Sequence, residues 1–391
     1  MSGVTLTAAT RQNLLSLQDT ASLTATTQNR LSTGLKVSSA LDNPVSFFTS
    51  QALSQRSGDL GGLLDGISNG VQAIQAANQG ITSIQKLVDQ AKSVANQALS
   101  TQITTTGTAS VGYSAPGTGG TTLGLYVNGS ATSVTLASGD TIDQAITKLN
   151  TAVGAGSFTK STDGTKLVMN ASSDVEFKDA ASQTALGFTA GSGTAPTYGT
   201  ASAVAQASEL TVSGVSARAT LASQYNSLLT QIDQLAGDSS FNGTNLINGK
   251  GDNNNLTINF NPKGNSNLTV TATDETSSGL GLKAITAGTS GTGNFLLNTD
   301  INKTLGTLTT ASNQLRTDAS TFGSNLSVVQ NRQDFSKNLI NVLDTGASNL
   351  TAADLNQEAA NSQALSTRQS LGISALSLAN TAQQGILQLL R

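Results

Sequence analysis

The C-terminal stretch, residues 348–391, constrains the fold more than any other part of the chain. Its apolar side chains fall on two seven-residue grids offset by three residues, one through Leu355, Leu376 and Leu390, the other through Leu365 and Ile386. Two grids with this offset are the a and d positions of a coiled coil. A single helix of this kind leaves its apolar stripe exposed to water, so the pattern predicts a partner helix.

The N-terminal hundred residues show the same spacing and are the natural partner. Leu14, Leu17 and Ala21 step by three and four residues. The alternation continues through Ile67, Val71, Ile74, Ile81, Ile84, Val88, Ala91, Ala95 and Ala98. At about 1.5 Å per residue, a continuous helix over residues 44–99 would extend about 80 Å, which predicts a rod.

The spacer between the two N-terminal helical stretches contains residues that end one helix and begin the next. Gly34 breaks the first helix, and Asp42 or Asn43 can cap the second, with Pro44 at its first helical position. The spacing alone is equally consistent with an ordinary helix-loop-helix corner.

Composition excludes several classes of function. Charged residues make up 11% of the chain and the net charge is −3, without the basic block of a nucleic-acid binder. No apolar run approaches the roughly 20 residues of a membrane helix. The chain has no Cys, His or Trp, which removes thiol chemistry and the commonest general base and metal ligand. We therefore expect no enzyme activity and no cofactor.

Three separated motifs resemble bacterial flagellins. The first is NRLSTGLKV at residues 29–37, followed by SALDN at 39–43. The second lies in the C-terminal stretch, from residue 353 through 380 to the terminal Leu-Leu-Arg. The third is FNGTNL at residues 241–246, which follows a predicted helix. The motifs occur in the order that the family shows.

This resemblance implies a mainly α-helical fold, in which paired terminal helices form a long coiled-coil rod and the middle of the chain faces outward. It implies a structural subunit that polymerises into the flagellar filament used for swimming. The partners implied are further copies of the chain, an export chaperone, the filament cap and hook-associated proteins. The start of the chain lacks a basic and an apolar signal region, which fits export through the flagellar type III channel to the extracellular filament.

We predict five segments along the chain. They are an N-terminal core helix at 1–43, an N-terminal rod helix at 44–100, an inserted outer α+β domain at 101–207, a region of two rod helices and a β-hairpin at 208–346, and a C-terminal core helix at 347–391. Residues 101–122 and 191–207 are interpreted as linkers rich in Thr, Gly and Ser, and Gly346 as the break before the last helix. Common flagellins carry their variable insert after the FNG segment, whereas this insert precedes it.

The insert has the turn signals of a small α+β module. Asn128-Gly129 and Asp163-Gly164 each predict a β-hairpin, and Thr141 can cap a helix between them. The order of strands, turns and helix resembles the IN motif of flagellins and of the filament cap protein. Further along, 210–235 and 301–344 predict helices, and residues 261–264 predict a hairpin turn.

The candidate site is an assembly interface. Its predicted core residues are Leu14, Leu17, Leu31, Leu35, Leu355, Leu365, Ile373, Leu376, Ile386 and Leu390. Four charged residues are candidates for ion pairs between subunits, although solvated surface positions explain them equally well: Arg30, Lys36, Asp42 and Arg56.

Other readings of local motifs are weaker. The segment from Gly243 to Lys250 has the wrong spacing for a phosphate-binding loop, and residues 251–255 carry one carboxylate, too few for a calcium site. In the family, an innate-immune receptor reads the first rod helix, but Lys86, Val88 and Gln90 depart from the pattern that it recognises. This departure argues against receptor recognition.

Two other functions remain as alternatives. A hook-filament junction protein shares both ends with flagellin but assembles as one short layer. A secreted adhesin could display the insert on helical stalks, but residues 101–207 show no aromatic cluster or charged patch that suggests a ligand.

Overall fold

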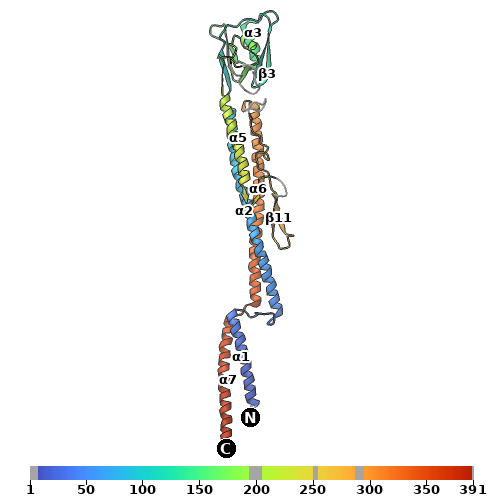
Figure 1. Ribbon diagram of the computed structural model, residues 1–391, viewed down its shortest axis with the longest axis vertical. Helices are drawn as coiled ribbons and strands as arrows, with labels where there is room; N and C mark the ends of the chain where they lie inside the picture. Colours follow the sequence, from blue (N-terminus) through green and yellow to red (C-terminus); the bar gives the residue numbers. More distant parts are fainter. Residues whose placement is uncertain (1–7, 193–204, 250–253, 287–294, 390–391) are drawn as a thin grey trace. The chain divides into compact units, whose positions relative to one another are not determined.

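The computed structural model describes residues 8–192, 205–249, 254–286 and 295–389. These residues form two compact units (Figure 1). Unit one comprises residues 1–68, 259–267 and 330–391, and unit two comprises 69–258 and 268–329. The mainly α-helical fold predicted from the heptad pattern is confirmed.

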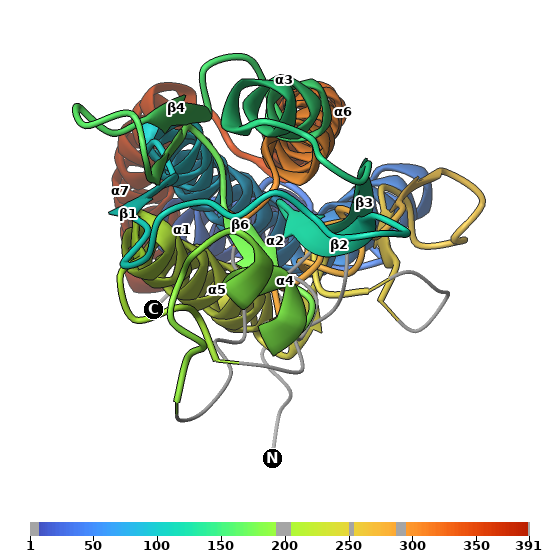
Figure 2. The same cartoon turned by 90° about the horizontal axis from the view of Figure 1, so that it is seen from above.

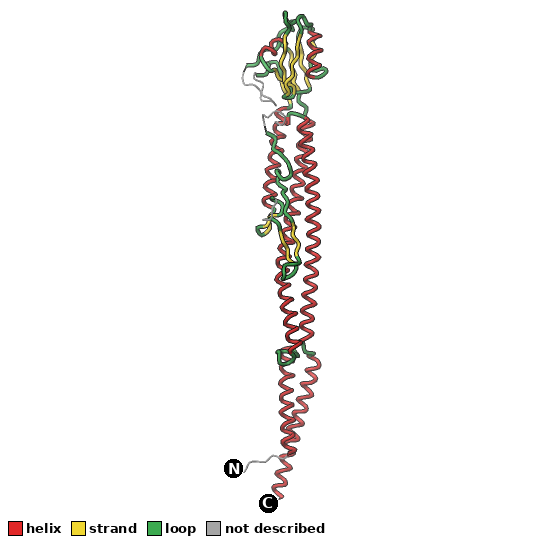
Figure 3. Tube along the Cα trace, turned by 90° about the vertical axis from the view of Figure 1, so that its right-hand side faces the viewer, coloured by secondary structure: helices red, strands yellow, loops and turns green. Residues whose placement is uncertain are grey.

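Unit one contains both terminal helices. Helix α1 (Ala8–Thr33) runs beside α7 (Leu355–Leu389) (Figures 1 and 3). Gly34, with a φ of 69°, ends α1 as predicted. The next helix, α2 (Pro44–Ser100), begins at Pro44, and Asn43 caps it by accepting a 3.1 Å hydrogen bond from the Ser46 N–H.

The last long helix, α6 (Asn298–Thr351), continues past the predicted break at Gly346. Gly346 therefore lies inside the helix, and the break falls at residues 352–354. A helical glycine costs only about 1 kcal/mol, so neighbouring contacts can override it. Here Ser50 of α2 donates a 3.1 Å hydrogen bond to the carbonyl of Ala347, and a β-carbon on Gly346 would meet Leu53 at 3.5 Å.

Unit two is built on buried apolar stripes of α2, α5 (Val215–Asp238) and α6. The stripe predicted along α2 is confirmed, because all its apolar positions from Ile67 to Ala98 are buried. Facing positions on the other two helices are also buried: Leu221, Tyr225, Leu229 and Ile232 on α5, and Leu308, Leu315, Phe322 and Val329 on α6. Gln85 of α2 donates a 2.8 Å hydrogen bond to Ser312 of α6.

The insert folds within unit two as an α+β module with two antiparallel sheets, ordered β4-β5-β1-β7 and β3-β2-β6. Figure 2 shows α3 and α4 on either side of its strands. Its elements are β1 (Thr104–Thr108), β2 (Thr121–Val127), β3 (Ser130–Leu136), α3 (Ile142–Val153), β4 (Phe158–Lys160), β5 (Leu167–Ala171), β6 (Val175–Phe177), α4 (Ala180–Ala185) and β7 (Thr211–Ser213). The core of the module includes Leu123, Leu149, Phe158, Met169 and Phe177.

The linker predicted at residues 101–122 is wrong, because β1 lies inside it and pairs with two strands. Thr105 is the register partner of Ala171 in β5 and of Val212 in β7. The sequence TTTGT lacks apolar alternation, but β-branched threonine suits a strand, and the pairing partners supply the packing. The helix predicted from residue 210 likewise begins later, at Val215, because β7 precedes it.

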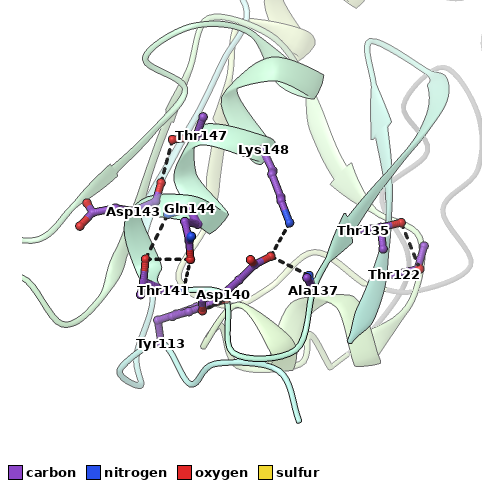
Figure 4. Close-up of polar contacts among 10 residues, drawn as sticks. All are labelled: Tyr113, Thr122, Thr135, Ala137, Asp140, Thr141, Asp143, Gln144, Thr147 and Lys148. Carbon is purple, nitrogen blue, oxygen red and sulfur yellow. Dashed lines mark hydrogen bonds and ion pairs between the residues drawn. The ribbon is translucent and has the colours of Figure 1, made fainter. Parts of the chain in front are cut away.

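The turns predicted in the module are confirmed. Asn128 and Gly129 both have positive φ, 48° and 78°, as a type I′ hairpin requires. Thr141 forms a capping box with Gln144 at the start of α3 (Figure 4). The Asp140 carboxylate beside it accepts hydrogen bonds from Lys148 Nζ at 2.5 Å and the Ala137 N–H at 2.6 Å. Most of the second predicted linker lies outside the described residues.

The FNGTNL motif ends α5. It forms a hairpin of β8 (Ser240–Phe241) and β9 (Thr244–Asn245), with Asn242 and Gly243 at positive φ. Asn245 donates to the carbonyls of Ala236 and Gly237 at 2.7 and 3.0 Å, which satisfies two carbonyls at the end of the helix. A second predicted hairpin, β10 (Leu256–Asn259) and β11 (Asn267–Val270), is confirmed.

Candidate assembly interface

Helix α7 presents one narrow stripe to α1. Between Leu355 and Asn380, the positions that are at least partly buried follow the two predicted seven-residue grids: Glu358, Ser362, Leu365, Gln369, Gly372, Leu376 and Ala379. Only two of these side chains, Leu365 and Leu376, are large and apolar. The stripe therefore has coiled-coil spacing but a small apolar content.

Helix α1 faces α7 with a stripe that the sequence pattern did not identify. Its partly or fully buried positions are Thr10, Asn13, Leu17, Thr20, Thr24, Thr27, Arg30 and Leu31. Of the predicted stripe through Leu14, Leu17 and Ala21, only Leu17 belongs to this set, and the other two residues are exposed in the single chain. Threonine can occupy a seam because its hydroxyl bonds back along the helix, as Thr20 does to the carbonyl of Ser16 at 2.7 Å.

The two stripes, which we call the terminal seam, approach closely at one glycine. A β-carbon added to Gly372 would lie 3.1 Å from two carbon atoms of Leu17, tighter than most side-chain contacts. Glycine at this position therefore lets Leu17 lie against the backbone of α7. A seam of threonine, glycine and few leucines buries little apolar surface, so it contributes little hydrophobic stabilisation.

An ion pair closes one end of the terminal seam. Arg30 of α1 and Glu358 of α7 approach to 3.1 Å, with their side chains 36% and 9% exposed. Arg30, a candidate for an ion pair between subunits, thus has an ion-pair partner within its own chain, and a contact with another subunit stays a prediction. The pair links the last turn of α1 to the first turn of α7.

The loop after α1 joins the two terminal helices. Leu35 forms an isolated antiparallel bridge with Ala352. The Lys36 N–H donates to the Thr351 carbonyl at 2.7 Å, and the Ala353 N–H donates to the Gly34 carbonyl at 2.9 Å. These bonds attach the loop to the end of α6 and the start of α7.

Asp42 organises the remainder of this loop. Its carboxylate accepts hydrogen bonds from the backbone N–H groups of Ser38 and Ser39, both at 2.9 Å, and from both serine hydroxyls. Hydrogen bonds from Ser39 and Ser38 hold the pKa of Asp42 below its usual range. Asp42, predicted as an intersubunit candidate, thus holds the conformation of its own loop and stays ionised. Lys36 and Arg56 are exposed.

Large apolar side chains outside the terminal seam face solvent. On α1 they are Leu14, Leu15 and Leu23, and on α7 they are Leu355, Leu371, Ile373 and Leu378, with exposed fractions from 42% to 73%. Soluble monomers rarely leave such patches uncovered, and contiguous ones mark interaction sites. The isolated pair of helices therefore carries apolar surface on sides that α1 and α7 do not cover for each other.

The ten predicted core residues divide into three groups. Leu17, Leu31, Leu365 and Leu376 lie in the terminal seam. Leu14, Leu35, Leu355 and Ile373 are exposed in the single chain. Ile386 lies in α7, but its side chain, like Leu390 as a whole, falls outside the described residues.

Three buried carboxyl groups with raised pKa values lie outside the terminal helices, in unit two. Asp174 and Glu176 flank Val175 on β6 and are 2% and 1% exposed. Burial raises the pKa of Asp174 to about 6, and burial together with Asp174 raises that of Glu176 to about 8. Glu275 is fully buried, and its burial, together with the nearby Asp318 carboxyl, raises its pKa to about 8.

These carboxyls do not form a metal site of the usual kind. Within the described residues, no group of three or more His, Cys, Asp or Glu side chains is placed to hold a metal ion. Among the same described residues, no helix has the length and hydropathy that a membrane crossing requires.

Fold and interface together define a class of protein: a mainly helical chain whose two ends pair along a narrow seam and present further apolar surface. The sequence profile of the bacterial flagellin N-terminal helical region matches residues 4–112. The profile of the flagellin C-terminal helical region matches residues 305–390. The chain belongs to the bacterial flagellin family.

Curated relatives that match this chain are flagellins. Flagellin FljK of Caulobacter vibrioides is 31% identical over 171 residues, which cover 44% of this chain and 59% of the relative. Flagellin FljN of the same organism is 34% identical over a stretch with the same coverage. Flagellin C of Rhizobium meliloti is 42% identical over 76 residues, 19% of this chain and 24% of the relative. The matched stretches thus span less than two thirds of each relative.

Proposed function

We propose that this chain is the structural subunit of a bacterial flagellar filament and acts in swimming motility without catalysis. The observation that carries the proposal is the contrast between a polar terminal seam and large apolar side chains facing outward on both terminal helices. Leu371, Ile373 and Leu378 on α7 are 56–73% exposed in the single chain. Burial of a leucine or isoleucine side chain is worth roughly 1.5–3 kcal/mol, so neighbouring copies would gain most by covering these residues.

Assembly would proceed through unlike surfaces. A heterologous contact that does not close into a ring produces an open helical filament. In this mechanism, the terminal seam sets the register of α1 and α7 within one chain, and the outward apolar residues pack against further copies. Arg30 and Glu358 would contribute by linking the two helices within one chain.

Family membership supports the wider setting of this function. We infer secretion through the flagellar type III channel to the extracellular filament, with an export chaperone, a filament cap and hook-associated proteins as partners. The predicted segments 1–43 and 347–391 would form the filament core, and the insert would face outward. The hook-filament junction is the second candidate, since such a protein shares both ends but stops after one layer.

The test substitutes the exposed apolar residues of α7. A chain carrying Leu371→Ser, Ile373→Ser and Leu378→Ser should lose sedimentable filaments, while the melting temperature and helix content of its monomer stay close to those of the unchanged chain. These residues make little contact within one chain, so the variant removes association rather than folding. The matched control, Val111→Ser, alters an apolar residue of the insert that is 64% exposed and should assemble normally.

Two results would contradict the proposal. Filaments of normal length from the triple variant would show that α7 does not carry the contact. Unchanged protein that forms short rings and never elongates from filament fragments would favour the junction protein instead.

A further inference from the structure

A groove of about 690 Å³ lies within unit one, between α2, α6 and the turn joining β10 to β11. Grooves of roughly 300–1,000 Å³ are large enough to enclose a small molecule or a few side chains. The α2 side contributes Arg56, Asp59 and Leu60, the turn contributes Phe260 to Lys263, and the α6 side contributes Arg332, Phe335 and Leu339.

The groove has an apolar floor and a cationic rim. Leu60 is 6% exposed, and the Arg332 guanidinium lies 5.6 Å from the ring centroid of Phe260. Phe335 is 59% exposed, although it belongs to an aromatic residue type that soluble proteins usually cover. Three cations and one carboxylate border the groove: Arg56, Lys263, Arg332 and Asp59. Its occupant should therefore combine apolar side chains with negative charge.

The loop between α1 and α2 has these properties. Leu41 is 96% exposed and Val45 is 77% exposed, which makes them among the most exposed large apolar residues that the structure describes. Asp42 stands beside Leu41, and its hydrogen bonds to Ser38 and Ser39 hold the loop in one conformation and favour the ionised carboxylate. A preformed loop loses little conformational entropy when it docks.

We propose that Leu41 and Val45 of one copy dock into this groove of a second copy, with Asp42 facing the cationic rim. The exposure of Leu41 shows that the loop does not fill a groove in its own chain. The occupant and the groove are different surfaces of the same protein, so each docked copy leaves one groove and one loop available for the next. The inference rests on the proposed function and names one of its subunit contacts.

The test uses cysteine cross-linking, because the natural chain has no cysteine. A full-length chain carrying Leu41→Cys and Phe335→Cys is assembled, treated with a short bismaleimide and run on a denaturing gel. We expect a ladder of covalent multimers. A mixture of the two single variants should give dimers only, because each chain then offers one thiol.

A matched control separates docking from random collision. The pair Leu41→Cys and Val111→Cys places the second thiol on an exposed insert residue, and it should cross-link at least tenfold less. Electron microscopy of the same samples reports filaments independently. Filaments without a ladder above the control would overturn the docking and leave the subunit proposal intact. Absence of filaments from the unchanged chain would overturn both.

A second test reverses one charge on the rim of the groove and needs no cross-linking. Lys263→Glu inverts one exposed rim charge, and it should raise the lowest protein concentration that supports filament growth at low salt by severalfold. The difference from the unchanged chain should shrink at high salt, because salt screens exposed charges. An unchanged threshold at low salt, with an unchanged monomer melting curve, would contradict the proposed role of the rim.

Discussion

Two residues of the insert module, Asp174 and Glu176, place ionisable carboxyl groups where water is excluded. Neither carboxyl oxygen of Glu176 has a hydrogen-bond partner in the structure, and the same is true of one oxygen of Asp174. Moving an unpaired carboxylate out of water is costly, so the neutral forms are favoured. The module therefore holds protons on these groups at pH values where an exposed carboxyl has lost them.

This arrangement predicts that the module becomes more stable on acidification. The pKa of Glu176 is about 8 in the folded chain against an ordinary 4.5, so the folded state binds more protons between these values. The stabilisation that this carboxyl contributes is fully present below about pH 4 and is lost as the pH rises through about 8. Glu176→Gln keeps the shape of the side chain and stays neutral at every pH, so it should reduce the decrease in the free energy of unfolding as the pH rises. Urea unfolding of both chains between about pH 5 and pH 9 measures it.

A control excludes a general pH effect on the chain. Asp143→Asn changes a carboxyl that is mostly exposed, and should leave the pH profile as it is in the unchanged chain. If Glu176→Gln shows the same slope as the unchanged chain, the carboxyl is not neutral in the folded module.

At the scale of one helix, two glycines of α2 have opposite surroundings. A β-carbon on Gly80 would lie 2.2 Å from the Ser239 hydroxyl and 2.7 Å from Ile247, whereas a β-carbon on Gly66 would meet nothing within 4 Å. Helix propensity alone favours alanine at both positions by about 1 kcal/mol. The outcome at Gly80 is therefore decided by packing.

We predict opposite signs for the two substitutions. Gly66→Ala should stabilise the monomer by up to about 1 kcal/mol, while Gly80→Ala should destabilise it by about 1–3 kcal/mol because the segment after α5 must shift. Denaturant unfolding of the monomers measures both changes. Equal effects at the two sites would show that α2 does not pack closely against residues 239–247.

The buried stripes of the helices differ in how well the sequence predicts them. The α2 stripe was predictable because Ile74, Ile84 and Val88 repeat a strong apolar signal at helical spacing. The α1 stripe was not, because threonine reads as polar although its hydroxyl is satisfied within the helix, as Thr20 illustrates. No local signal distinguishes a seam threonine from a surface threonine.

Contacts between positions far apart in the sequence were the second feature that the sequence pattern could not predict. The sequence of strand β1 resembles a linker because its stability comes from β5 and β7, whose paired residues lie 60 to 109 positions further along the chain. The Arg30–Glu358 pair likewise joins positions from opposite ends of the sequence. The sequence pattern placed the candidate interface on the two terminal helices. Only the structure distinguishes the side of each helix that lies in the terminal seam from the side that faces solvent.

At the scale of the whole chain, the insert begins and ends at neighbouring positions. Thr104 in β1 and Ser213 in β7 are register partners, so the chain leaves the helical part of unit two and returns to it side by side. Insertions with adjacent ends can be removed with little strain on what remains. The module is therefore separable from the helices at residues 104 and 213, the paired ends of β1 and β7, and these two strands belong to it.

Excision of the module should therefore preserve assembly. A chain in which residues 104–213 are replaced by a short glycine turn should remain helical and form filaments near the usual concentration. A deletion of residues 123–193 instead leaves β1 and β7 without β5, and should aggregate. Circular dichroism and electron microscopy test both. A folded excised chain that never polymerises would show that the insert takes part in subunit contacts.

The central claim is that the terminal helices drive open-ended polymerisation. The most direct measurement is electron microscopy of the purified full-length chain, added at rising concentration to short filament fragments. We predict that the fragments lengthen into helical filaments above a threshold concentration, and that the triple α7 variant does not lengthen them. A chain that stays monomeric, or adds one layer and stops at every concentration, would contradict the account.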